Sequence, residues 1–174
     1  KPVQAGELNH SDSIKVAALI NNDRTKIHPE TYKLNRPMSP HAAAERDGIE
    51  IDISSFKTPH TNNHLVIEGA GGLLVPLNDK DTILNLIESL NCEVILVSRH
   101  YLGSINHTLM SIEALQQRNI TIKGILFNGK ENKDTESIIT KMSGVNIIGR
   151  IDELDHLNKS VINSVAQNLK NKLI

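Results

Sequence analysis

Short apolar runs alternate with helix-like patterns along most of the chain. The runs are rich in β-branched residues and leucine, which predicts buried strands at Leu65–Ile67, Val94–Val97, Ile120–Asn128 and Val145–Ile148. Lys1–Gly6 predicts the end of a further strand and a turn. Helical spacing or capping residues predict helices at 14–20, 39–48, 81–90, 134–142 and 155–173. A loop at 102–108 passes into a further helix that ends at about 117. This alternation predicts an α/β fold, a mostly parallel sheet with helices on both faces, and one domain over residues 1–174.

Several polar residues fit the ends of these helices. Ser11 or Asp12 can cap the helix at 14–20, and Asp81 can cap the helix at 81–90. Asp12 can equally be a metal ligand, because a first-turn acid near a phosphate can hold a divalent cation. Ser39 starts a short helix whose amino end offers free N–H groups to an anion.

Composition narrows the class of protein. Of 174 residues, 39% are hydrophobic and 2% aromatic, so the core is aliphatic, and the net charge of -1 gives no general attraction to nucleic acid or anionic membrane. No apolar run is long enough to span a bilayer. Cys92 is the only cysteine and cannot form an internal disulfide, which favours a reducing, cytoplasmic setting.

The stretch His64–Leu77, HLVIEGAGGLLVPL, combines an apolar run, an acid and a glycine-rich turn. Glu68 ends the run, and glycines beside it allow a ligand to approach the backbone. One interpretation is a metal-phosphate site at the end of a strand. The other is a solvated glutamate before a tight turn, and the spacing alone leaves both open.

The polar candidates share one place in the predicted fold. Asp12, Glu68, the 98–103 segment, Asn128 and the 151–154 segment all follow strands or begin helices. Ligands bind at the carboxyl ends of parallel strands, so we expect these residues at one rim of the sheet. Lys1 lies either at this rim or in solvent.

Six motifs keep the order found in one enzyme family. They are KPVQAG at 1–6, HSDS at 10–13, RPMSPHAAA at 36–44, VIEGAGGLLVPL at 66–77, LGSINHTL at 102–109 and KGILFNG at 123–129. Together they resemble dethiobiotin synthetase and imply a three-layer fold like that of P-loop NTPases. The family begins with a strand, a phosphate-binding Gly-Lys-Thr loop and a helix, which lie outside the resemblance. We therefore expect an N-terminally truncated chain, without the first strand and P-loop, that is inactive alone.

The resemblance implies a ligase of biotin biosynthesis that forms C–N bonds. Such an enzyme makes dethiobiotin from 7,8-diaminononanoate and CO2 through a phosphorylated carbamate, with ATP as co-substrate and Mg2+ as cofactor. It implies a cytoplasmic homodimer without a nucleic-acid or membrane partner. The alternatives are a related P-loop amidoligase or ATPase with another substrate, and a non-catalytic binding protein lacking the P-loop.

The resemblance assigns the chemistry to a lysine and two acids. Lys1 matches the catalytic lysine that bridges carbamate and γ-phosphate. Asp12 and Glu68 match the Mg2+ ligands, and through the metal they also contact the nucleotide. The residues that follow Glu68 and line the nucleotide are Gly69, Ala70 and Gly71.

Two later segments match the adenine-contacting positions of the family. Asn128 and Gly129 follow a strand, and an amide offers both a donor and an acceptor to a base edge. The second segment, with adenine and ribose contacts, comprises Asp152, Glu153 and Leu154. The family usually has Ile-Pro there, and Ile151-Asp152 departs from it.

The substrate positions come from three further motifs. Ser39 heads a helix whose amino end lies near the carbamate in the family. Ala5 stands where the family commonly has Ser or Thr, and its side chain cannot donate a hydrogen bond. Either the backbone makes that contact with the substrate, or substrate binding is weaker by about 1 kcal/mol. In the family, a turn at the dimer interface holds the substrate's distal carboxylate in the site of the partner subunit. The matching residues here are Gly103, Ser104, Ile105 and Asn106.

Overall fold

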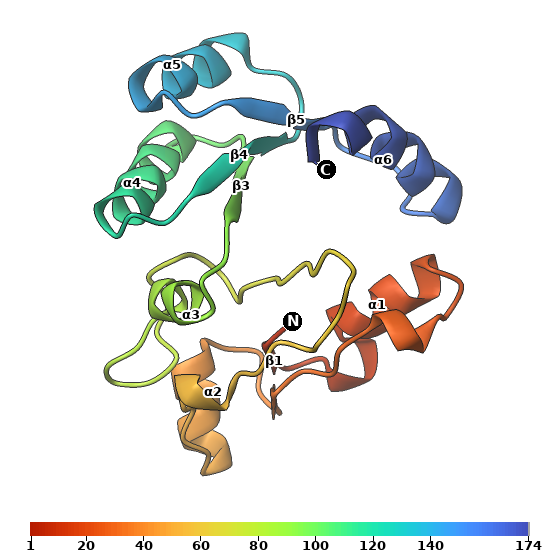
Figure 1. Cartoon of the computed structure of the whole chain (residues 1–174), viewed down its shortest axis with the longest axis vertical. Helices are drawn as coiled ribbons and strands as arrows, with labels where there is room; N and C mark the ends of the chain where they lie inside the picture. Colours follow the sequence, from red (N-terminus) through yellow and green to blue (C-terminus); the bar gives the residue numbers. More distant parts are fainter. Residues whose placement is uncertain (174) are drawn as a thin grey trace. The chain divides into compact units, whose positions relative to one another are not determined.

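The computed structural model describes residues 1–173, which form two compact units. The first extends from Lys1 to Leu90 and the second begins at Asn91. Each contains a parallel sheet with helices packed against it (Figure 1). The predicted α/β class is confirmed, whereas the prediction of one domain over 1–174 stays a prediction.

The sheet of the first unit has two short parallel strands. β1 (Val3–Ala5) pairs with β2 (Tyr32–Leu34), and α2 (Pro40–Asp47) packs against both. Their apolar side chains form a core with Leu77. The other helices are α1 (Asp12–Leu19), α3 (Ile83–Ser89) and the single-turn helices η1 (Leu8–His10), η2 (Arg24–Lys26) and η3 (Ile53–Ser55).

The helix caps only partly follow the sequence prediction. Ser11 caps α1, with its hydroxyl accepting from the N–H of Ile14 at 3.4 Å, so the carboxylate of Asp12 is not used as a cap. The assignment of Asp81 as a cap was wrong. Thr82 caps α3 in a reciprocal capping box with Asn85.

The predicted strand at Leu65–Ile67 is wrong for the described structure. These residues form no strand, and Val66 is 89% exposed. A β-branched run becomes a strand only when a neighbour exchanges backbone hydrogen bonds with it. Within residues 1–173, no strand pairs with this segment. The sequence analysis also predicted no strand at the position of β2.

The second unit contains three parallel strands in sequence order. β3 (Val94–Arg99), β4 (Ile122–Asn128) and β5 (Ile147–Ile151) are hydrogen-bonded in that order. The register aligns their carboxyl ends, because Arg99 pairs with Asn128 and Asn128 with Ile151. β5 lies later in the sequence than the predicted Val145–Ile148.

Helices cover both sides of this second sheet (Figure 1). α4 (Ser104–Gln117) and α5 (Lys133–Ser143) pack against each other, and α6 (Lys159–Leu173) packs against β5. α6 begins at Lys159 rather than at the predicted Asp155. No helix within residues 1–173 is long and apolar enough to cross a membrane.

One edge of this sheet carries exposed apolar side chains. β3 is an edge strand, and its Val97 is 61% exposed. In the described part of the chain, no strand pairs with the outer edge of β3.

Gly124 allows β4 to approach the start of β5 closely. A Cβ at this buried position would lie 2.9 Å from the backbone oxygen of Asn146 and 2.6 Å from Cγ1 of Ile148. That oxygen accepts from the N–H of Ile125 at 2.9 Å, so it cannot move without loss of the pairing. The approach therefore requires glycine.

We expect Gly124→Ala to destabilise the protein by about 1–3 kcal/mol, because overpacking moves backbone atoms of the sheet. Urea unfolding measures this change. Gly72→Ala is the matched control, since an added Cβ there meets nothing within 4 Å. Equal stability of the two variants would contradict the packing argument.

Candidate functional site

Lys1, Asp12 and Glu68 meet at one point of the first unit. The Lys1 ammonium is paired with Oδ2 of Asp12, and its Nζ lies 3.3 Å from Oε1 of Glu68. Lys1 precedes β1, Asp12 is the first residue of α1, and Glu68 precedes the glycine turn. The structure thus brings together the three residues that the sequence assigned to catalysis and metal binding.

The two closest partners stabilise each other's charges. Burial opposes the charge of Lys1, but the hydrogen bond to Asp12 and the charges of both acids outweigh it and raise the pKa of Lys1. The same hydrogen bond is the main reason why the pKa of Asp12 lies below its ordinary value. Lys1 and Asp12 are therefore both charged at neutral pH.

These residues fit a divalent cation. Asp12 and Glu68 both contact one ammonium, so their carboxylates can reach one cation, and oxygen ligands suit Mg2+. Residues 1–173 contain no group of three or more His, Cys, Asp or Glu side chains that could hold a metal. The other ligands of a cation at this point would therefore be phosphate or water oxygens, as is usual for Mg2+.

The turn after Glu68 keeps its backbone close to its neighbours. Gly71 has φ 80°, and a Cβ there would lie 2.9 Å from Cγ2 of Val75. A Cβ at Gly69 would lie 3.2 Å from Cγ2 of Ile83 in α3, and Ala70 packs against the core. Small residues are thus needed at this turn for conformation and packing, independently of any ligand.

The KPVQAG and RPMSP motifs lie against each other. Gly6 has φ 71°, and a Cβ there would lie 2.6 Å from Cβ of Pro37. The end of β1, which carries Ala5, is therefore next to the segment that leads to α2. Ser39 is the N-cap of α2 but its side chain makes no capping hydrogen bond, so its hydroxyl can serve a ligand.

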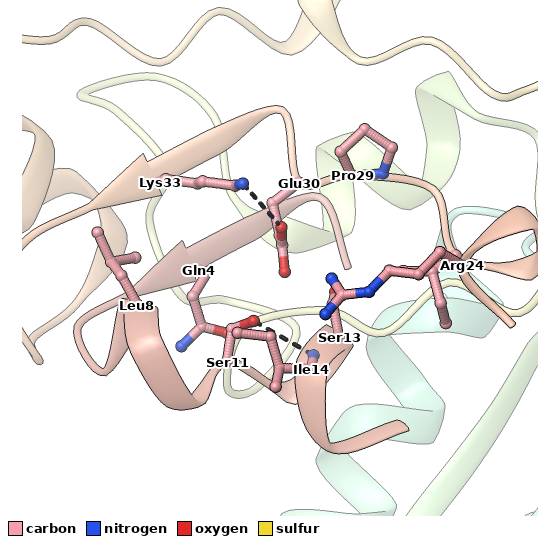
Figure 2. Close-up of a pocket in the computed structure, with 10 residues that line it drawn as sticks. Gln4, Leu8, Ser11, Ser13, Ile14, Arg24, Pro29, Glu30 and Lys33 are labelled. Carbon is pink, nitrogen blue, oxygen red and sulfur yellow. Dashed lines mark hydrogen bonds and ion pairs between the residues drawn. The ribbon is translucent and has the colours of Figure 1, made fainter. Parts of the chain in front are cut away.

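A cavity of about 250 Å³ adjoins β1, and no sequence motif predicted it (Figure 2). Gln4 and Glu30 line this cavity together with Arg24, whose guanidinium extends toward it. The Oε1 atoms of Gln4 and Glu30 are buried without a hydrogen-bond partner among the described residues. Polar walls and this volume leave room for water molecules, which can donate to such oxygens.

In the second unit, Asn128 and Gly129 are tied to the end of β5. The Nδ2 of Asn128 donates to the carbonyl oxygen of Ile151 at 3.2 Å, and the N–H of Gly129 donates to the same oxygen at 2.9 Å. Asp152, which follows at once, lies with Oδ1 3.3 Å from Nε of Arg150. The two predicted base-contacting segments are therefore adjacent, with Glu153 and Leu154 next in sequence.

The LGSINH turn forms the amino end of α4. Gly103 is its N-cap with φ 99°, a conformation that favours glycine. Ser104 is buried and donates its N–H to the oxygen of Tyr101 at 3.0 Å, whereas Ile105 and Asn106 are exposed. The turn thus presents free N–H groups of a long helix to the solvent. That this turn and the Lys1 cluster gather at one rim stays a prediction.

The parallel sheets flanked by helices are consistent with the fold of the P-loop NTPases, a class of nucleotide-binding proteins. A family model described as an AAA domain matches residues 1–161.

Comparison with known proteins identifies the family within this class. The chain is 51% identical to the ATP-dependent dethiobiotin synthetase BioD of Christiangramia forsetii over 173 residues, which cover 99% of this chain and 83% of that protein. It is 47% identical to the enzyme of the same name from Cytophaga hutchinsonii (97% and 82% covered). It is 42% identical to that from Rhodopseudomonas palustris (99% and 82% covered). The chain belongs to the dethiobiotin synthetase family, as its motifs predicted.

We expect low pH to reduce the folding stability of the first unit through protonation of Asp12. Its folded-state pKa lies below the ordinary 3.8, so the ionised carboxylate stabilises the fold above that value. This stabilisation is lost as pH falls through the lowered pKa. The free energy of unfolding is measured with urea in chelator-treated buffer. The difference in this free energy between the parent and Asp12→Asn should be larger at about pH 6 than at about pH 3. A difference that does not change with pH would contradict the pairing with Lys1.

Proposed function

We propose that this protein forms dethiobiotin from 7,8-diaminononanoate and CO2 with consumption of ATP. The observation that carries the proposal is the convergence of Lys1, Asp12 and Glu68 in a chain related over nearly its whole length to named synthetases. The three residues form a site of one ammonium and two carboxylates. Such a site suits phosphoryl transfer, which depends on positioning and charge stabilisation.

Asp12 and Glu68 would hold Mg2+. When bound, the metal neutralises phosphate oxygens of the nucleotide. These are the same two carboxylates that contact the Lys1 ammonium in this structure. Lys1 would turn to the anions that must approach each other, the substrate carbamate and the γ-phosphate. An ammonium acts there as a mobile point charge that reduces the repulsion between them.

Asn128 and Gly129 would contact the adenine, with Asp152, Glu153 and Leu154 completing the base and ribose contacts. Support comes from their adjacency at the ends of β4 and β5, where ligands of parallel sheets bind. The amide of Asn128 carries both a donor and an acceptor for the base edge. Gly69, Ala70 and Gly71 would line the nucleotide on the metal side.

The substrate would contact Ala5 and Ser39 in one subunit and the turn from Gly103 to Asn106 in the other. Exposed apolar side chains beside that turn support a homodimer, since Leu102 is fully exposed and Tyr101 half-exposed. The free N–H groups at the start of α4 suit the far carboxylate of 7,8-diaminononanoate. Ala5 gives the substrate no side-chain hydrogen bond.

The activity is tested with the protein made from the complete coding sequence. We expect ADP release that requires 7,8-diaminononanoate and bicarbonate, with a product of the mass of dethiobiotin. Other diamines and amino acids serve as acceptor controls. ADP release that follows another amine, or none, would overturn the proposal in favour of a related amidoligase or a binding protein.

Loss of either proposed metal ligand should weaken the binding of Mg2+. We expect Glu68→Gln and Asp12→Asn each to raise the Mg2+ concentration for half-maximal rate by about tenfold or more, because each removes a charged ligand. Glu50→Gln, at an exposed acid outside the site, is the control. Full turnover with an unchanged Mg2+ requirement in both variants would refute the metal assignment.

A further inference from the structure

One carboxylate joins the three strand ends of the second unit. Oε1 of Glu136 lies 3.0 Å from Nε2 of His100 and 2.8 Å from Nη1 of Arg150. His100 follows β3, Arg150 lies in β5, and Glu136 is in the first turn of α5, the helix after β4. A single oxygen thus connects elements that are far apart in the sequence.

This cluster is shielded and charged. The side chains of His100 and Glu136 are 11% and 13% exposed. Burial opposes the charge of Glu136, but hydrogen bonds from His100, Asn132 and Arg150 outweigh it and lower its pKa. The His100 ring also stacks on the buried Phe127, with centroids 5.3 Å apart. Charge-assisted hydrogen bonds in such a place hold their groups firmly.

Arg150 extends the cluster to the segments beside the proposed adenine site. Its Nη2 lies 3.1 Å from Oε1 of Glu131 in the β4–α5 loop, and its Nε lies 3.3 Å from Oδ1 of Asp152. The next residue, Ile151, supplies the carbonyl oxygen that accepts from the amide of Asn128. The same oxygen accepts from the N–H of Gly129, and Arg150 ties the strand that carries this carbonyl to Glu131 in the loop after Gly129.

We infer that Arg150 and Glu136 are positioning residues that fix the orientation of the Asn128 amide and thereby select the base. The inference rests on the proposed function, in which Asn128 contacts adenine. Because Nδ2 of Asn128 donates to the carbonyl oxygen of Ile151, Oδ1 of the same amide is directed away from that carbonyl. Oδ1 can then accept a hydrogen bond from the exocyclic amino group of adenine. Guanine carries an acceptor oxygen at that position and would be disfavoured.

Nucleotide binding tests this role directly. The dissociation constants of non-hydrolysable ATP and GTP analogues are measured by calorimetry, with Mg2+, on the protein from the complete coding sequence. We expect the parent to prefer ATP and Arg150→Gln to reduce the ATP-to-GTP preference by about tenfold, because the amide can then turn over. Arg46→Gln, at an exposed arginine of α2, is the matched control and should keep the parent's preference.

The outcomes separate the inference from the proposed function. If the parent binds neither nucleotide, the proposed function fails. If it binds ATP without preference, or if Arg150→Gln weakens both analogues equally, the inference is overturned. If Arg150→Gln does not fold, Glu136→Gln is tested in its place. Glu136→Gln keeps the shape of the side chain and removes its charge. An unchanged preference in that variant would also overturn the inference.

Discussion

The candidate active site depends on one ammonium held between two carboxylates. Asp12 and Glu68 carry like charges, and their proximity is favourable only with a cation near both. Lys1 supplies that cation in this structure, and its own charge is retained despite partial burial because of the same acids. The site is therefore stabilised by a single ammonium that offsets part of the charge of two carboxylates.

The sequence predicted the architecture where local signals were strong. β3, β4 and most helices follow from apolar periodicity, and the residues of the Lys1 cluster follow from their motifs. The prediction failed at Leu65–Ile67, because a strand needs a pairing neighbour that composition does not reveal. It failed at Asp81 because Thr82 and Asn85 cap α3 together and Asp81 hydrogen-bonds with Asn78 instead.

The cluster of His100, Glu136 and Arg150 shows a different limit of sequence reasoning. Each residue is an ordinary polar position in its own segment, and only the register of the three strands brings them to one oxygen. No spacing along the chain encodes that meeting. The arrangement nevertheless follows from a simple rule, since consecutive parallel strands deliver the residues after them to the same edge.

The exposed edge of β3 has a consequence for handling the protein. Within residues 1–173, no strand pairs with the outer edge of β3, which carries the exposed Val97. Such an edge is a template for a strand from another molecule. Concentrated solutions of the chain should therefore self-associate through backbone pairing. Such association increases with concentration and responds little to salt, unlike contacts between charged surfaces.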